Sequence, residues 1–270
     1  MKISPTARVK YAHNPLAEVL CQIRFENIEN FSTVLESGLR SGLIGKGYSV
    51  EAKEQELTFN IMVSPEKEVS LPPRPMPMTS IFHFSSEDSV WKISICESFL
   101  AVTCTAYDSW ETFKPRVVDV CRLLGVFYPE TRPVRIGLRY KDVIERDPLG
   151  LSDVPWSRLI SPFLLGPLAM GALSDDIAIS EDDAENFVSQ AQFSLDDCKL
   201  LLQSSLLTSS DGSKRAFLID ADFFEHLDPE EELLSDSGTL ESHMDVLHNN
   251  AGALFRRSIT EELHAALSPQ

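Results

Sequence analysis

Hydrophobic and polar residues alternate most regularly in the segment "PVRIGLRYKDVI", at residues 133–144. Apolar side chains occupy every second position from 134 to 140, and Arg135, Gly137, Arg139 and Lys141 stand between them. A period of two over eight residues is typical of a β-strand with one apolar and one basic face. The pattern therefore predicts a strand whose positive charges either bind an anion or are neutralised by acidic side chains.

Similar patterns predict the other elements of the chain. Strands are expected at 17–25, near 48–63, and at 80–84, 89–98, 99–107, 187–195, 199–207 and 215–224. Apolar residues three and four apart predict helices at 31–47, 108–128 and about 239–265, and a short helix ending at Ser161 before Pro162. The prolines between Pro72 and Pro77 exclude a central strand or helix there and predict a loop.

The order of these elements is the same in both halves of the chain: three strands and then a helix. We therefore predict an α+β fold of mostly antiparallel sheets in two related strand-strand-strand-helix halves, with the helices packed on the sheets. The halves are expected at residues 1–145 and 146–270 and to pack intimately. No residue-level repeat supports the relationship, which rests on the order of elements alone.

Composition and length are those of a soluble globular protein. Of the 270 residues 43% are hydrophobic and 24% charged, and no apolar run approaches the ~20 residues needed to cross a bilayer. The beginning of the chain lacks the apolar stretch of a signal peptide. The five cysteines are widely spaced, without a C-x-x-C motif, which favours reduced thiols. We expect a cytoplasmic protein that does not bind membranes.

The negative charge of the chain is confined to its second half. Residues 1–140 contain 16 Lys and Arg and 16 Asp and Glu, whereas residues 141–270 contain 8 and 25, which gives the net charge of −17. An acidic half makes nucleic-acid binding unlikely because the phosphate backbone repels it. It favours a protein partner or self-association.

Familiar catalytic and phosphate-binding motifs are missing from the sequence. It contains no Walker-type or dinucleotide-binding glycine loop, no G-x-S-x-G elbow and no H-E-x-x-H pair. This favours a non-enzymatic protein-interaction or regulatory module without a cofactor, which binds its partner through the acidic half. The alternative is an enzyme or sensor that binds a small anionic ligand.

Arg24, Arg135 and Arg139 are the candidate residues for such a ligand. If the strand at 17–25 lies beside the strand at 133–144, the three arginines converge on one sheet face, where Gly137 leaves room for a carboxylate or phosphate. A competing interpretation pairs Arg135 and Arg139 with Asp220 and Asp222 of the acidic half. Because one half is neutral and the other acidic, we favour this pairing.

A weaker hypothesis is a metal site formed by Asp220, Asp222 and His248. The two aspartates in "LIDADFF" share one face of a predicted strand and could bracket Mg²⁺, with the helical His248 as a further ligand. The alternative is that both aspartates form ion pairs and that His248 is an ordinary helix-face histidine.

Five segments also occur in a characteristic order and spacing: "NPLAEVLCQIRF", "FLAVTCTAYDSWETF", "RIGLRYKDVI", "FLIDADFF" and "VLHNNAGALFRRSIT". Together they resemble the TIGR04255 family of sporadically distributed bacterial and archaeal proteins, over roughly residues 10–266. The resemblance implies no assigned reaction. A patchy distribution is common among genes of defence or mobile-element neighbourhoods, so the resemblance implies a module of a bacterial multi-gene, defence-associated system.

Overall fold

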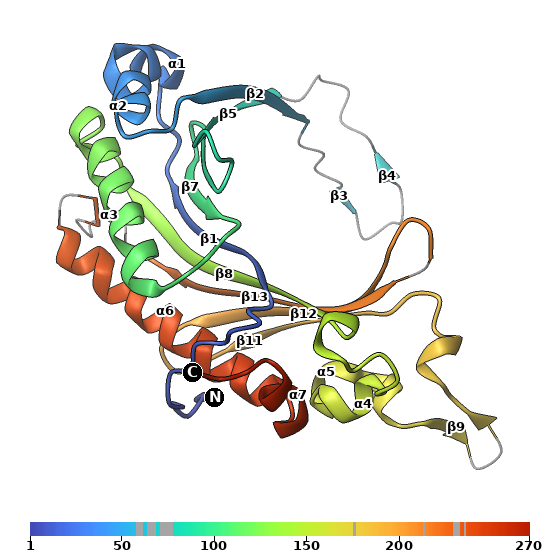
Figure 1. Cartoon of the computed structure of the whole chain (residues 1–270). Coiled ribbons are helices and arrows are strands. Elements are labelled where there is room, and N and C mark those ends of the chain that lie inside the picture. Colours follow the sequence, from blue (N-terminus) through green and yellow to red (C-terminus); the bar gives the residue numbers. More distant parts are fainter. Residues whose placement is uncertain are drawn as a thin grey trace.

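A single antiparallel sheet of nine strands forms the centre of the protein (Figure 1). The computed structural model describes residues 1–57, 62–63, 69–70, 78–174, 177–212, 214–228, 233–234 and 236–270. The strands are β1 (Leu16–Phe25), β2 (Val50–Leu57), β5 (Met78–Ser85), β6 (Trp91–Ile95), β7 (Phe99–Cys104), β8 (Pro133–Glu145), β11 (Val188–Ser194), β12 (Lys199–Thr208) and β13 (Arg215–His226). The predicted α+β class is confirmed.

The strand order relates the two halves of the chain. It is β11-β12-β13-β8-β1-β7-β6-β5-β2, so β1 and β8 lie side by side at the centre. Outward from β1 come β7, β6, β5 and β2, and outward from β8 come β13, β12 and β11. Each half thus has one central strand and a meander that returns to it. This order groups β8 with the strands that follow it, whereas the predicted boundary at residue 145 groups it with those before.

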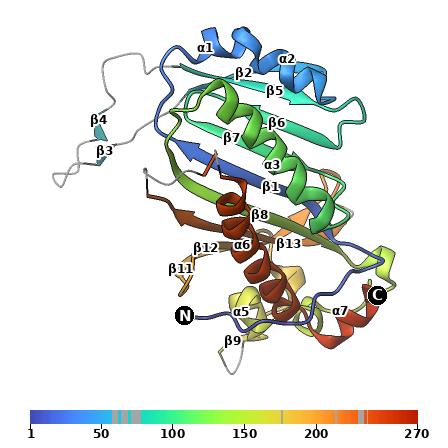
Figure 2. The same ribbon diagram turned by 90° about the vertical axis from the view of Figure 1, so that its left-hand side faces the viewer.

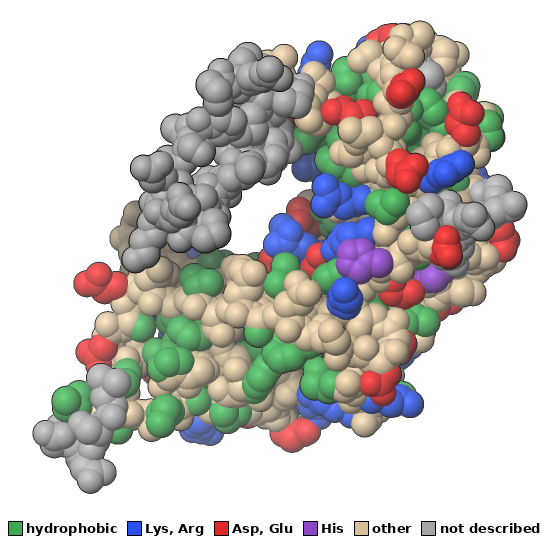
Figure 3. All heavy atoms as spheres, turned by 180° about the vertical axis from the view of Figure 1, so that it is seen from behind, with side chains coloured by type: hydrophobic (Ala, Val, Ile, Leu, Met, Phe, Trp, Pro, Cys, Tyr) green, Lys and Arg blue, Asp and Glu red, His purple; other side chains and the backbone are tan. Residues whose placement is uncertain are grey.

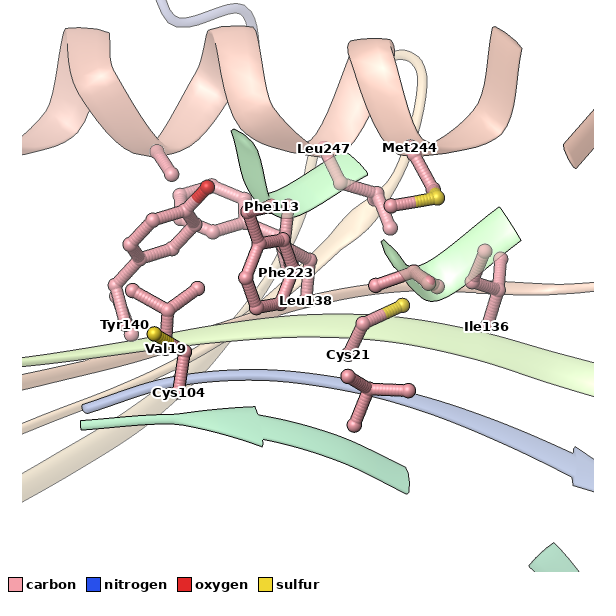
Figure 4. Packing of buried hydrophobic residues seen from close by; sticks show 14 of the residues in the cluster. Val19, Cys21, Cys104, Phe113, Ile136, Leu138, Tyr140, Phe223, Met244 and Leu247 are labelled. Carbon is pink, nitrogen blue, oxygen red and sulfur yellow. The ribbon is translucent and has the colours of Figure 1, made fainter. Parts of the chain in front are cut away.

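Two long helices cover one face of the sheet, α3 (Trp110–Phe127) and α6 (Ser237–Ser258) (Figure 2). Ser109 caps α3 by accepting a hydrogen bond from the backbone N–H of Thr112. The main core lies between these helices and the alternate strand residues that face them. Figure 4 shows strand residues such as Val19, Cys21 and Leu138 packed against Phe113 of α3 and Met244 and Leu247 of α6.

The helix predicted at 31–47 is broken in the middle. It consists of α1 (Phe31–Val34), a wider turn at Leu35–Leu39 and α2 (Arg40–Gly45). Gly38 has a φ of 155°, and a Cβ there would lie 2.4 Å from Cε1 of Phe127. The close approach of the Phe127 ring therefore requires a glycine and bends the chain at this point.

The helix predicted at 239–265 also has a break, because α6 is followed by a separate helix α7 (Glu261–Ala266). Ile259 between them is extended and forms a bridge with Ile160, while the Thr260 hydroxyl caps α7 by accepting from the Leu263 N–H. The short helix predicted before Pro162 is α4 (Trp156–Leu159), and α5 (Pro162–Leu165) follows it directly.

The remaining elements are short. They are the two-stranded pairs β3 (Met62–Val63) with β4 (Val69–Ser70) and β9 (Ala172–Ser174) with β10 (Ile177–Ala178), and helical turns at Asp147–Leu149, Gly166–Ala169 and Glu181–Asp183. Of the predicted proline-rich loop, residues 71–77 lie outside the described part of the chain. Within the described part, no helix is both long and apolar enough to cross a membrane.

Candidate functional site

The predicted arginine cluster lies on the sheet face opposite α3 and α6. Arg24 of β1 stands directly opposite Arg135 of β8, and Asp222 of β13 stands opposite Arg139. Alternation along the strands places all of these side chains on one face, together with Asp220. Lysine and arginine side chains gather around the hollow on this side of the molecule (Figure 3).

The predicted pairing of the arginines with the acidic half is confirmed. Arg139 donates from Nε and Nη2 to the two carboxylate oxygens of Asp220, at 2.6 and 2.5 Å, and Arg135 donates from Nη2 to Asp222 at 2.7 Å. Asp220 is 7% exposed, so the ion pair is largely shielded from water on its acidic side. These ion pairs thus join β8 to β13, which lies in the acidic part of the sequence.

The space beside Gly137 is occupied by Arg135. A Cβ at Gly137 would lie 2.6 Å from Nη1 of Arg135, whose guanidinium group also lies 4.4 Å from the centre of the Phe224 ring. The glycine therefore makes room for an arginine of its own strand. Arg24 is exposed and forms no ion pair with a described residue. A ligand-binding role for Arg24, Arg135 and Arg139 stays a prediction.

The three metal candidates do not converge. Ala221 of β13 stands opposite Tyr140 of β8, and the Tyr140 hydroxyl contacts His248 on the helix-covered side. Asp220 and Asp222 flank Ala221 in the strand and therefore point to the other face. Among the residues that the structure describes, no group of three or more His, Cys, Asp and Glu side chains could hold a metal ion.

A pocket of about 720 Å³ lies on the helix-covered side of the sheet. Its floor is formed by β8 and β13, and its walls by the residues before and within the first turn of α3 and by the second half of α6. The N-terminal segment at residues 5–11 closes it on the outside. Aromatic side chains line much of it, namely Tyr11, Tyr107, Trp110, Tyr140 and Phe255.

His248 of α6 connects two of these aromatic side chains. Its ring stacks on the indole of Trp110, with 4.1 Å between the ring centres and an interplanar angle of 6°, and its Nδ1 is 2.7 Å from the Tyr140 hydroxyl. Burial lowers the pKa of His248 to about 4. The imidazole is therefore neutral at pH 7, which suits its place against an aromatic wall.

Trp110 is held in place by the acidic and basic groups behind it. Its Nε1 donates to Asp245 Oδ1 at 2.7 Å, and Asp245 also accepts from Lys114 at 3.1 and 3.2 Å. Hydrogen bonds from Trp110 and Lys114 outweigh the effect of burial and lower the pKa of Asp245. This network joins the beginning of α3 to α6 and fixes the orientation of the pocket wall.

Asp142 lies in the floor of the pocket and is the least expected residue there. It follows Tyr140 in the apolar register of β8 and is 5% exposed. Its carboxyl group has no hydrogen-bond or ion-pair partner among the described residues. Burial, with a smaller contribution from Asp220, raises the pKa of Asp142 to about 8. A buried carboxyl group without a partner is costly in a purely structural position.

The sequence contained a signal for Asp142. Every second residue from Ile136 to Ile144 belongs to the face that packs against the helices, and Asp142 is the charged exception. The alternation of apolar and basic residues ends at Lys141, and its continuation places Asp142 on the apolar face. Tyr140 had been assigned to the apolar face, where it does lie, but its contact with His248 depends on the position of α6 and is not readable from the sequence.

The N-terminal segment is fixed over the pocket by contacts with three elements. Arg8 donates to Asn249 of α6 at 3.0 Å, and Lys10 donates to Asp108 at 2.6 Å. The Tyr11 hydroxyl is 2.8 Å from Nδ1 of His264 in α7. Figure 2 shows this segment passing α6 before it enters β1. The ion pair is exposed, and such pairs contribute little to stability.

Comparisons with known proteins give no family for this chain. No protein-family model matches it, and no curated protein matches it either. The resemblance to the TIGR04255 family stays a prediction.

Proposed function

We propose that the protein binds a small organic molecule in the pocket between the sheet, α3, α6 and the N-terminal segment. The observation that carries this proposal is the buried and unpartnered Asp142 in a pocket of about 720 Å³. Pockets of roughly 300–1,000 Å³ with mostly apolar walls and a few polar groups are typical of small-molecule sites. This function corresponds to a sensor or regulatory module.

The proposal is tested by filling the pocket from α6. Gly252 lines the pocket, and a Cβ at this position meets no atom within 4 Å. A leucine there therefore enters open space, and it replaces a glycine that is unfavourable in a helix. The matched control is Gly45→Leu at the end of α2, where a Cβ likewise meets nothing and which does not line the pocket.

The measurement is the change in melting temperature with three compounds that share a phenyl ring. These are 2-phenylethylamine, 2-phenylethanol and 3-phenylpropanoate, a cation, a neutral alcohol and an anion. We expect at least one of them to stabilise the wild type and Gly45→Leu at millimolar concentration, because a ligand that binds the native state raises its melting temperature. Gly252→Leu should abolish the shift. No shift with any compound, or equal shifts in all three proteins, would contradict the proposal.

A second candidate is a protein-interaction module, which β11 supports. This strand lies at the edge of the sheet, six of its seven residues are exposed, and it carries no charge or proline. Edge strands usually carry charged residues or proline, which prevent pairing with other chains. A strand of a partner protein could add to β11, which belongs to the acidic half.

Ala191→Lys places a charge in the middle of β11 and tests this second candidate. We expect the wild type to capture a partner from extracts of its native host and Ala191→Lys to lose it. Capture of the same protein by both would contradict an interaction through β11.

A further inference from the structure

We propose that the pocket takes an organic cation, whose ammonium group pairs with Asp142 while its apolar part lies against the aromatic walls. This inference rests on the proposed small-molecule binding and adds the chemical class of the ligand. It follows from three properties of the pocket: an unpaired acidic group at the floor, paired charges elsewhere, and aromatic rings around the space between them.

Asp142 is the group that a cation would satisfy. It is 95% buried, lines the pocket and has no ion-pair partner among the described residues, so its ionised form lacks a counter-ion and most of its hydration. The histidine in the wall, His248, is neutral at pH 7 and already contacts Tyr140. A positively charged ligand would supply the missing counter-ion, and the burial of Asp142 limits the screening of this interaction by water.

The other charged side chains that line the pocket are already paired. Arg8 is 3.9 Å from Glu111, Lys10 contacts Asp108, and Arg256 contacts Glu261. These three basic groups therefore do not offer an anionic ligand a free partner. Among the acidic side chains of the described lining, Asp142 is the one without an ion pair.

The walls suit the rest of a cationic ligand. Tyr11, Tyr107, Trp110 and Tyr140 bring aromatic rings to the space above Asp142. Aromatic faces carry negative electrostatic potential and attract alkylammonium groups at distances up to about 6 Å. The same rings bury the hydrocarbon part of the ligand. A neutral ligand would use the rings but not Asp142, and an anion would be repelled by its ionised carboxylate.

Binding of a cation is expected to depend on pH through Asp142. Burial keeps its pKa near 8, so the carboxyl is mainly protonated at pH 7 and must release a proton to pair with an ammonium group. The titratable and charged groups that line the pocket with it are Arg8, Lys10, Tyr11, Tyr107, Asp108, Glu111, Tyr140, His248 and Arg256, and Asp220 lies behind it on the other face of the sheet. None of the lining groups for which a shift is resolved has a pKa near 8.

The test is a titration of the 270-residue protein with 2-phenylethylamine and 2-phenylethanol at pH 6, 7 and 8, in which ligand-detected NMR measures binding. We expect the amine to bind more tightly than the alcohol at pH 8, and its affinity to rise about tenfold from pH 6 to pH 7 and less above that. Asp142→Asn should weaken the amine at least tenfold at pH 8 and leave the alcohol within twofold. The two ligands are compared on the wild type, so this part of the test does not depend on whether a variant folds.

The inference is overturned if the amine and the alcohol bind equally, if 3-phenylpropanoate binds more tightly than the amine, or if Asp142→Asn binds the amine like the wild type. In these cases Gly252→Leu still separates the two proposals. If Gly252→Leu blocks binding but the protein shows no preference for the amine, the proposed small-molecule pocket stands and the proposed preference for a cation is wrong. Absence of any binding sensitive to Gly252→Leu rejects both.

Discussion

Asp142 is the residue on which the proposed function depends. A carboxyl group that is 5% exposed and unpaired occupies a position that apolar side chains hold elsewhere in the same strand. Such a residue lowers the stability of the fold, and residues of this kind are expected at functional sites. The pocket above it provides such a site, because a bound cation would satisfy the carboxylate that the fold leaves alone.

The cost of Asp142 predicts how stability varies with pH. Its pKa is raised from 3.8 to about 8 in the folded protein, so between these values the unfolded chain has released a proton that the folded chain retains. The contribution of Asp142 to the free energy of unfolding therefore falls as pH rises through this window. Asp142→Asn removes the effect.

We expect Asp142→Asn and the wild type to be about equally stable near pH 4. Their difference should then grow in favour of the variant by at most about 1.4 kcal/mol per pH unit, and level off above pH 8. Urea unfolding at a series of pH values measures it. A difference that is constant from pH 4 to pH 8 would show that Asp142 does not retain its proton in the folded state.

The ion pair between Arg139 and Asp220 was predicted from the sequence and is confirmed. The unequal charge of the two halves indicated it, and the alternation along each strand placed the side chains on one face. The sequence assigned no role to Asp142 and considered His248 only as a metal ligand or a helix-face histidine, because the positions of both residues in the pocket depend on how the helices and the N-terminal segment pack. A pattern along the chain shows which face a residue belongs to, but not what space remains beside it.

A double-mutant cycle tests the ion pair. Arg139→Ala leaves the buried Asp220 carboxylate without its two-bond partner and should lower the free energy of unfolding by about 2–3 kcal/mol. In an Asp220→Asn background the same change should cost less than about 1 kcal/mol. The coupling energy is obtained from urea unfolding of the four proteins. A coupling of zero would mean that the pair does not contribute to stability.

At the scale of elements, helix and strand positions followed from periodicity, but the breaks in helices did not. The bend at Gly38 arises because Phe127 of α3, which is distant in sequence, packs where a Cβ would be. The end of α6 arises because Ile259 forms a bridge with Ile160. Both depend on tertiary contacts, whereas the apolar spacing of the segments at 31–47 and 239–265 continues across the breaks.

Gly38→Ala tests the bend. The φ of 155° is unfavourable for alanine, and the new methyl group would displace the Phe127 ring, so we expect a loss of about 1–3 kcal/mol in the free energy of unfolding. Gly45→Ala in α2 is the control and should be neutral or slightly stabilising, because nothing lies within 4 Å of its Cβ. Equal effects of the two substitutions would contradict the proposed cause of the bend.

At the scale of the whole molecule, the two halves depend on each other through β1 and β8. These strands pair along nearly their whole length at the centre of the sheet, and α3 packs against α6 above it. The sequence predicted two related halves from the order of elements, and that relationship stays a prediction. The sequence did not indicate that both halves extend one sheet, because a strand pattern does not identify its neighbour.

This arrangement predicts that neither half folds alone. Fragments 1–132 and 133–270 would each expose a long apolar central strand and half of the core, so we expect both to be unfolded or aggregated when produced separately. Co-expression should restore a soluble complex. Circular dichroism and cooperative thermal unfolding report the outcome. A fragment that is soluble alone and unfolds cooperatively would show that the halves are independent domains.

Binding of a cation at Asp142 can be observed directly in a crystal structure of the protein grown with 2-phenylethylamine at pH 8. We expect the amine to occupy the pocket, with its nitrogen within about 3 Å of an Asp142 oxygen and its ring against the aromatic walls. An empty pocket at a concentration that saturates binding in solution would contradict it, as would an amine bound away from Asp142.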